Sequence, residues 1–273
     1  MTSLTEHIIE LAGEPVFYRE TPGPGRCAVY LHSLPTSSAD WLPFLDHGRA
    51  LAPDLPGFGR STKGGHLGYA LDDHVRFLEA FLDSVAVDET VALAGHGWGG
   101  ALALAYAQRH PARVGALAII DALPLLEGFA WPGVARQALW PGIGEFVMGS
   151  VTRRRLGRAL RAGVADPAVW SDEQIEAVWE QFDQGTQRAI LRVARSIGAT
   201  ELARAGSGLS ALSAPTLIVW GEEDPWLPAR FAAAYASALP AAELAMIPGA
   251  GHWPWLESPG VIDRVTAFLS AVP

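Results

Sequence analysis

The chain of 273 residues has a single cysteine, no excess of basic residues and no long uninterrupted apolar stretch. One thiol, Cys27, excludes a disulfide within the chain, and its place in an apolar run predicts a buried structural residue. No apolar segment is long enough to span a bilayer without an interrupting charge, glycine or proline. Residues 1–10 lack the basic and apolar regions of a secretory signal. We therefore expect a cytoplasmic protein with no membrane partner.

The balance of charge also narrows the class of partner. There are 20 Lys and Arg residues against 29 Asp and Glu residues, a net charge of −9 at pH 7. An acidic chain of this kind does not favour nucleic acid as a partner. The hydrophobic fraction of 49% is typical of a globular protein with a sizeable core. We expect a small-molecule substrate as the partner, and the oligomeric state stays open.

Short apolar runs alternate with helical periodicity along most of the chain, which predicts an α/β fold with a mostly parallel sheet. Residues 7–10 and 15–18 are expected to form an opening hairpin. The core strands are predicted at residues 27–32, 49–53, 91–94, 114–120, 216–220 and 243–247. Helices are predicted at residues 71–85, 101–108 and 261–269.

The alternation stops in the middle of the chain, where helical patterns have no clear strand between them. We therefore divide the chain into an α/β core, residues 1–121 and 214–273, and a helical cap, residues 122–213. Large apolar side chains in the cap either form its own core or line a substrate pocket; they are Trp131, Trp140, Phe146, Met148, Trp170, Trp179 and Phe182. A predicted helix over residues 152–162 carries Arg154, Arg158 and Arg161 on one face, which we expect to be solvated.

The most informative segment is residues 95–100, with the sequence GHGWGG. It lies between a predicted strand and a predicted helix, which is the context of a nucleophile elbow, a sharp turn that presents a reactive side chain. The central residue, Gly97, has no side chain. Glycine adopts the strained backbone of such a turn freely, so the turn is kept while covalent catalysis through residue 97 is lost.

Three further segments accompany the elbow: residues 30–35 (YLHSLP), residues 51–61 (LAPDLPGFGRS) and residues 247–253 (IPGAGHW). Together the four motifs resemble the α/β-hydrolase superfamily, in the same order along the chain. The elbow is most similar to that of haloalkane dehalogenases and epoxide hydrolases, which carry Asp at the central position; some esterase-type relatives carry Ser. The resemblance implies an eight-stranded, mostly parallel sheet flanked by helices, with an inserted helical cap.

The resemblance also assigns roles to particular residues. His252 is expected to be the proton carrier, and Asp224, after the seventh strand, is expected to bind its other ring nitrogen. Asp121, at the end of the sixth strand, is the alternative acid. The backbone N–H groups of Leu34 and Trp98 are the expected oxyanion hole. The indole of Trp98 either binds a leaving group, as the corresponding tryptophan does in dehalogenases, or forms a wall of the pocket.

The segment around His32 departs from the family pattern. Ser33 replaces the glycine that usually follows this histidine, so its hydroxyl could act as a displaced nucleophile, although such a loop is not built to aim a side chain. We expect His32, Ser33, Trp131 and Trp253 to line the substrate pocket. No organic cofactor and no metal are implied, because there is no dinucleotide fingerprint and the histidines are not at ligand spacing.

Three interpretations of Gly97 follow. In the first, His252 and Asp224 act as a general base on water or on a small, mostly apolar substrate, with the oxyanion hole stabilising charge. In the second, the chain is a catalytically silent protein that binds a small ligand. In the third, Gly97 replaces an Asp or Ser, so that the chain is the nucleophile-knockout form of a dehalogenase-like, epoxide hydrolase-like or esterase-like hydrolase.

Overall fold

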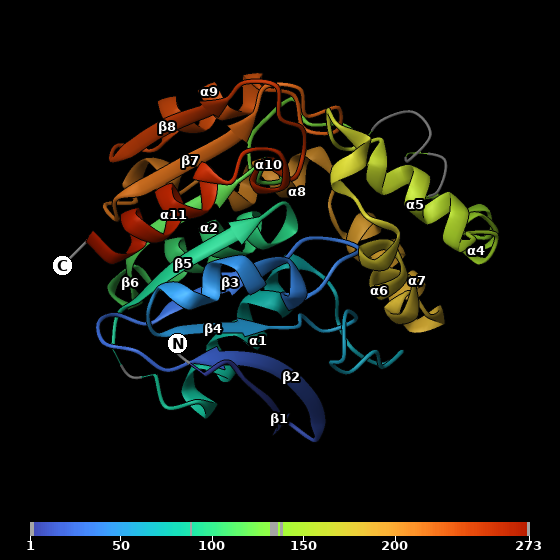
Figure 1. Ribbon diagram of the computed structural model, residues 1–273, viewed down its shortest axis with the longest axis horizontal. Coiled ribbons are helices and arrows are strands. Elements are labelled where there is room, and N and C mark those ends of the chain that lie inside the picture. Colours follow the sequence, from blue (N-terminus) through green and yellow to red (C-terminus); the bar gives the residue numbers. More distant parts are fainter. Residues whose placement is uncertain (1–2, 88, 132–135, 137–138, 272–273) are drawn as a thin grey trace.

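A single eight-stranded sheet runs through the protein. The computed structural model describes residues 3–87, 89–131, 136 and 139–271 (Figure 1). The strand order is β1-β2-β4-β3-β5-β6-β7-β8, with both pairings of β2 antiparallel and all others parallel. The strands are β1 (Thr5–Leu11), β2 (Glu14–Thr21), β3 (Ala28–Leu31), β4 (Ala50–Pro53), β5 (Val91–His96), β6 (Val114–Ile120), β7 (Thr216–Gly221) and β8 (Ala242–Ile247). The predicted fold class and all eight predicted strands are confirmed.

The helices fall into those that follow strands of the sheet and those inserted between β6 and β7. The first group is α1 (Leu71–Ser84), α2 (Trp98–Arg109), α9 (Arg230–Ala238), α10 (Pro254–Glu257) and α11 (Gly260–Ala271). The second group is α4 (Ile143–Gly149), α5 (Arg153–Arg161), α6 (Asp172–Gln181), α7 (Gln184–Ser196) and α8 (Ala199–Ala205). Short 3-10 helices occupy Ser38–His47, Pro111–Arg113, Pro167–Val169 and Leu209–Ala211.

Two hydrophobic cores lie on opposite faces of the sheet. Successive strand residues point to opposite faces, and in β5 Leu93 belongs to one core while its neighbours Ala92 and Ala94 belong to the other. Helices α1, α2 and α9 contribute to the Leu93 core, and α11 contributes to the other. The sheet is therefore buried on both faces, as expected of a parallel sheet in an α/β protein.

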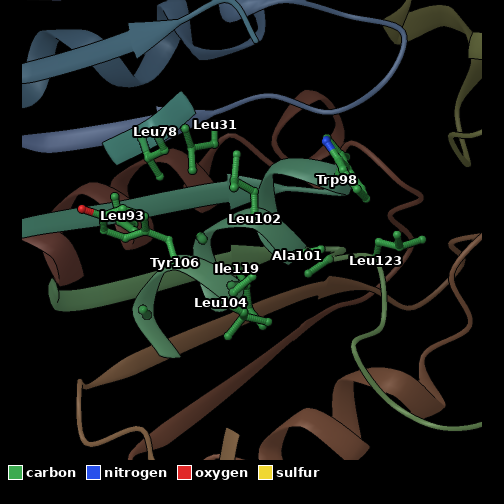
Figure 2. Packing of buried hydrophobic residues seen from close by; sticks show 14 of the residues in the cluster. Leu31, Leu78, Leu93, Trp98, Ala101, Leu102, Leu104, Tyr106, Ile119 and Leu123 are labelled. Carbon is green, nitrogen blue, oxygen red and sulfur yellow. The ribbon is translucent and has the colours of Figure 1, made fainter. Parts of the chain in front are cut away.

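Helix α2 packs very closely on the strands, because half of its residues are glycine or alanine. Figure 2 shows Leu102, Leu104 and Tyr106 of this helix among side chains of the sheet, with Trp98 at one end of the group. Gly99 requires the absence of a side chain, since a Cβ there would overlap the carbonyl oxygen of Leu31. This contact places the start of α2 directly on the end of β3.

Only helices and loops are found among the described residues between β6 and β7. Figure 1 shows α4–α7 beyond the end of the sheet to which the β5 arrow points. The predicted cap, residues 122–213, also contains residues 132–135, 137 and 138, which lie outside the described residues. The boundaries of core and cap therefore stay a prediction from the sequence.

The large side chains of the predicted cap differ in their surroundings. Trp170 and Phe182 are buried in the core on the α11 side of the sheet, which they share with residues of the sheet and of α11. Trp140 and Phe146 are 60% and 78% exposed, so neither expectation, cap core or pocket lining, holds for them. The exposed Arg154 and Arg158 match the expected solvated face of α5. Arg161 differs, because it forms an ion pair with Asp172 and is half-buried.

The single cysteine and the apolar character of the helices can both be examined in the structure. Cys27 is buried, and its burial raises the pKa of the thiol to about 12. Among the described residues, no helix combines the length and apolar character that a membrane span requires.

Candidate active site

The glycine-rich turn between β5 and α2 has the geometry of an elbow. Gly97 stands between the end of the strand at His96 and the start of the helix at Trp98, with φ at 51°. Its N–H donates to the carbonyl of Ile120 at 3.1 Å, and its own carbonyl accepts from Leu123 at 2.8 Å. A positive φ of this kind favours glycine, and the two hydrogen bonds fix the turn to the segment that follows β6.

The space beside Gly97 is occupied by the side chain of another residue. A Cβ on residue 97 would overlap the hydroxyl oxygen of Ser33 and lie 2.8 Å from the Ser33 Cβ. The same position is 3.6 Å from Nε2 of His252. We call this point the 97-Cβ position. The expectation that the Ser33 loop does not aim its side chain at the site is wrong, because the hydroxyl lies where the side chain of residue 97 would begin.

Strand register explains why Ser33 lies beside Gly97. In the parallel pairing of β3 with β5, Leu31 is opposite Gly95, and two further residues along each chain bring Ser33 level with Gly97. The carbonyl of Ser33 accepts hydrogen bonds from Nδ1 of His32 at 2.7 Å and from the Thr36 hydroxyl at 3.2 Å. These two bonds hold the backbone of the loop at the residue that faces the elbow.

The predicted acid–base pair is present. Nδ1 of His252 is 2.7 Å from Oδ2 of Asp224, and both side chains are buried. The other carboxylate oxygen of Asp224 accepts from the N–H groups of Trp226 at 2.7 Å and Leu227 at 3.0 Å. Burial alone would raise the pKa of Asp224, but the charge and hydrogen bond of His252 and these two N–H groups outweigh it and lower this pKa. An ionised Asp224 accepts a proton-bearing Nδ1, which leaves Nε2 of His252 as the basic nitrogen.

The backbone of His252 is fixed by two groups that the sequence argument did not identify. Its carbonyl accepts from Nε2 of His96 at 2.8 Å, and its N–H donates to the carbonyl of Gly163 at 2.7 Å. Burial lowers the pKa of His96 well below its usual value. Glu257 accepts from the N–H of Gly251 at 2.6 Å and from that of Asp166 at 2.7 Å, joining the histidine loop to the inserted helices. The only sequence signal for His96 was its place in the elbow motif.

Asp121, the alternative acid, lies close to the pair without binding the histidine. One of its oxygens accepts from the N–H of Gly221 at 3.0 Å, and the other is buried without a hydrogen-bond partner. Burial and the neighbouring Asp224 raise the pKa of Asp121 well above its usual value. Atoms of Asp121, Asp224 and His252 lie within 4.8 Å of one another, near enough to share a metal ion. However, the direct bond between His252 and Asp224 is the arrangement of a base and its orienting acid.

A cavity of about 250 Å³ opens beside the 97-Cβ position. Its lining is mostly apolar, and the described residues around it are Ser33, Leu34, Gly97, Trp98, Leu123, Phe129, Trp131, Val193, Ile197, Trp226, Leu227 and His252. Among the predicted pocket residues, Ser33 and Trp131 line this cavity. His32 and Trp253 do not: the ring of His32 bonds its own loop, and Trp253 lines a separate cavity of about 320 Å³.

Both residues of the expected oxyanion hole, Leu34 and Trp98, lie at this cavity. The N–H of Trp98 begins helix α2 and donates to the Ser33 hydroxyl at 3.3 Å. The start of a helix favours negative charge, so this N–H can stabilise an oxygen that becomes negative. The indole N–H groups of Trp98 and Trp131 are buried without a hydrogen-bond partner.

Several named proteins are similar to this chain. It is 36% identical to a haloalkane dehalogenase of Mesorhizobium japonicum over 148 residues, which is 50% of this chain and 47% of that protein. It is 29% identical to a 2-hydroxy-6-oxo-2,4-heptadienoate hydrolase of Pseudomonas putida, covering 95% of this chain and 90% of that one. The solved structure of the haloalkane dehalogenase DatA from Agrobacterium tumefaciens has the same fold, with a TM-score of 0.83 at 23% identity and coverage of 99% and 98%.

The family model described as the alpha/beta hydrolase fold matches residues 29–259. This match includes the elbow, the Ser33 loop and both members of the His252–Asp224 pair. The chain therefore belongs to the α/β-hydrolase family.

Proposed function

We propose that this enzyme hydrolyses a small, mostly apolar molecule, with His252 as the general base and Asp224 as the acid that orients it. The observation that carries the proposal is the position of Nε2 of His252, 3.6 Å from the 97-Cβ position and at the wall of the cavity. A base at this place can take the proton of an oxygen that attacks a substrate beside the elbow. The N–H groups of Leu34 and Trp98 would stabilise the negative charge that develops on the substrate.

The lining of the cavity supports this substrate class. Leu123, Phe129 and Val193 are among the apolar groups, whereas Ser33 and His252 are the polar side chains at the elbow. Small-molecule sites commonly combine an apolar wall with a few polar groups that fix orientation. The size of about 250 Å³ suits a small substrate. A small molecule is thus the proposed partner, and the cytoplasmic location remains an expectation from the sequence.

The names of relatives suggest which substrates to try. Haloalkane dehalogenases and epoxide hydrolases of this family use a carboxylate at the elbow, which Gly97 does not provide. The developing negative charge near the Leu34 and Trp98 amides is better matched to attack on a carbonyl group. We therefore propose a carbonyl compound, such as a short-chain ester or an oxo acid, ahead of an alkyl halide or an epoxide.

A panel of p-nitrophenyl acetate, p-nitrophenyl butyrate, 1-bromobutane and styrene oxide tests the proposal on the purified chain. We expect slow ester hydrolysis that falls by at least about 100-fold in His252→Ala. His66→Ala is the matched control, because His66 is an exposed histidine paired with Glu14. Ester hydrolysis that survives in His252→Ala would contradict the proposal. An inactive protein that binds a small apolar ligand tightly would favour the silent binding protein instead.

A further inference from the structure

We infer that the hydroxyl of Ser33 is the nucleophile of this enzyme, taking over from the adjacent loop the role that the elbow side chain has lost. The inference rests on the proposed function, because it needs His252 as the base. It adds a catalytic residue and a covalent intermediate to that function. Four observations support it: the position of the hydroxyl, its uniqueness in the cavity, the hydrogen bond that it accepts and the mutual exclusion of side chains at positions 33 and 97.

The position is the first observation. The Ser33 hydroxyl overlaps the 97-Cβ position, the point from which an elbow side chain would start. Nε2 of His252 is 3.6 Å from that same point. The hydroxyl and the base therefore both lie within 3.6 Å of one point, so a short approach of the two would form their hydrogen bond. Catalytic hydrogen bonds are often looser without substrate than with it.

Uniqueness in the cavity is the second observation. Among the described residues that line it, Ser33 is the only one with a hydroxyl, a thiol, a carboxylate or an amine. Cys27, the single thiol of the chain, is buried within the core beneath α1 and α2 and is absent from this lining. Apart from the base His252, a substrate held beside the elbow can therefore meet one nucleophilic side chain in the described lining, which is Ser33.

The N–H of Trp98 provides the third observation. It donates to the Ser33 hydroxyl oxygen at 3.3 Å from the first residue of helix α2. A hydrogen bond from a helix N-terminus stabilises negative charge on an oxygen. The contact therefore favours an Oγ that is losing its proton, and it keeps the hydroxyl at the mouth of the oxyanion hole.

The fourth observation is that positions 33 and 97 have room for only one side chain. Ser33 stands where the family pattern has glycine, and Gly97 stands where that pattern has the nucleophile. A Cβ on residue 97 would overlap the Ser33 hydroxyl. The side chain beside His252 thus comes from the end of β3 and not from the end of β5.

The reaction would proceed in two balanced steps. The Ser33 oxygen adds to the carbonyl carbon of an ester while its proton passes to Nε2 of His252. The carbonyl electrons move to the carbonyl oxygen, which accepts from the Leu34 N–H and from the Trp98 N–H, as the latter turns from the Ser33 oxygen to this oxygen. Collapse breaks the bond to the alcohol, which takes the proton from His252, leaving an acyl group on Ser33. Water then adds in the same way, and the Ser33 oxygen leaves with the returned proton.

Covalent labelling tests the inference directly. The intact chain is treated with an alkyl fluorophosphonate and analysed by mass spectrometry, with peptide mapping of the modified residue. We expect one phosphonyl group on Ser33 and none in Ser33→Ala, together with a loss of ester hydrolysis of at least about 100-fold. Ser237→Ala is the matched control, because the Ser237 hydroxyl is exposed and bonds within α9.

A cysteine variant separates a chemical role from a structural one. In Ser33→Cys, iodoacetamide should alkylate residue 33 before the buried Cys27, and the rate should fall when His252→Ala is added. Modification of Cys27 first, or a rate independent of His252, would count against a nucleophilic position.

The outcomes distinguish this inference from the function on which it rests. If Ser33→Ala keeps the ester hydrolysis that His252→Ala loses, water is the nucleophile, the proposed function stands and the inference is overturned. If the unmodified chain hydrolyses no ester, the proposed function fails; phosphonyl labelling of Ser33 would still support the inference, and absence of labelling would overturn it as well.

Discussion

The two sides of the cavity are built in opposite ways. On one side, His252 is bound through its ring by Asp224, through its carbonyl by His96 and through its N–H by Gly163, all within 2.8 Å. On the other side, the elbow keeps its turn and its hydrogen bonds but has no side chain at Gly97. The base is thus held in one orientation, while the group that it should act on comes from a neighbouring loop.

This difference shows that the elbow supplies two things that can be separated. Its backbone positions the N–H of Trp98 and the start of α2, and neither depends on the side chain of residue 97. The reactive side chain can come from any residue that the fold brings to the same point. Parallel register makes the end of β3 such a place, because Leu31 is opposite Gly95.

The largest effect is expected on the base side of the cavity, from Asp224→Asn. The amide carries no charge to orient and stabilise a protonated His252, so we expect kcat for ester hydrolysis to fall by about 10²- to 10⁴-fold. Steady-state kinetics of the purified variant measure this loss.

Asp121→Asn is the matched control for that change. Burial and Asp224 raise the pKa of Asp121 well above its usual value, which favours the neutral form of the carboxyl, and an amide resembles that form in shape and charge. We expect a change in kcat within about 10-fold. A greater loss in Asp121→Asn than in Asp224→Asn would reverse the assignment of the orienting acid.

The next effect concerns the elbow side of the cavity, at Gly97 and Ser33, and is measured as a change in the free energy of unfolding. Gly97→Ala should cost about 1–3 kcal/mol for its positive φ, and the overlap with Ser33 should add to this. Ser33→Gly in the same chain should remove the added part, giving a coupling of about 0.5–3 kcal/mol in a double-mutant cycle of urea unfolding.

Gly13→Ala isolates the backbone contribution in that experiment. Gly13 has φ at 83° and no atom within 4 Å of the place where its Cβ would lie. Its variant should show the cost of a positive φ without any overlap. Strictly additive effects of the changes at positions 33 and 97 would mean that the two side chains do not compete for one space.

Substitutions at positions 33 and 97 can also test whether a nucleophile can be restored at the elbow, with glycine at position 33. Gly97→Ser alone should be a poor route to an elbow nucleophile, because Ser33 already fills the space. Ser33→Gly combined with Gly97→Ser should be more stable than Gly97→Ser alone and should carry the phosphonyl label on residue 97.

A smaller effect is expected at the link between the histidine loop and the inserted helices. Glu257→Ala leaves the N–H groups of Gly251 and Asp166 without their acceptor. We expect a loss of about 1–3 kcal/mol in the free energy of unfolding. In addition, kcat should fall more than KM rises, because the position of His252 becomes less fixed. An unchanged kcat at unchanged stability would show that this link does not position the base.

Much of the fold could be predicted because strands of a buried parallel sheet are short apolar runs. Residues 114–120 were predicted as a strand with the bounds that β6 has. Helix α2 begins three residues earlier than predicted, at Trp98, because the glycines of the elbow hid its first turn. The pattern of apolar residues thus predicts which strands and helices form better than it predicts where they begin and end, because their ends depend on contacts with other segments.

The site was partly predictable for a similar reason. The family resemblance of the motifs predicted the contact of His252 with Asp224, with Asp121 as the alternative acid. It did not predict the place of the Ser33 side chain, which follows from the register of β3 against β5. His32 and Trp253 were wrongly assigned to the pocket, since neighbouring residues in extended segments point in different directions. The bond between His96 and the His252 carbonyl spans 156 positions and has no local signal.

The smallest effect is a dependence of stability on pH that distinguishes two carboxyl groups. Asp40 is half-buried at the separate cavity of about 320 Å³ that Trp253 also lines. Its burial raises its pKa to about 7, although the Thr36 hydroxyl donates a hydrogen bond to it at 2.5 Å. Between the ordinary value of 3.8 and about 7, the folded chain holds a proton on Asp40 that the unfolded chain has lost. Its contribution to stability is therefore present below pH 4 and is lost as the pH rises towards 7.

Asp40→Asn should consequently stabilise the protein relative to the unmodified chain as the pH rises from about 4 to 7. Asp224→Asn should act with the opposite sign, because the pKa of Asp224 is lowered: its contribution is present above the ordinary value of 3.8 and is lost as the pH falls through the folded value. Urea midpoints at several pH values between about 2 and 8 measure both slopes. Parallel curves for Asp40→Asn and the unmodified chain would show that this carboxyl is ionised in the folded protein. The burial of Asp40 would then have no effect on how the free energy of unfolding depends on pH.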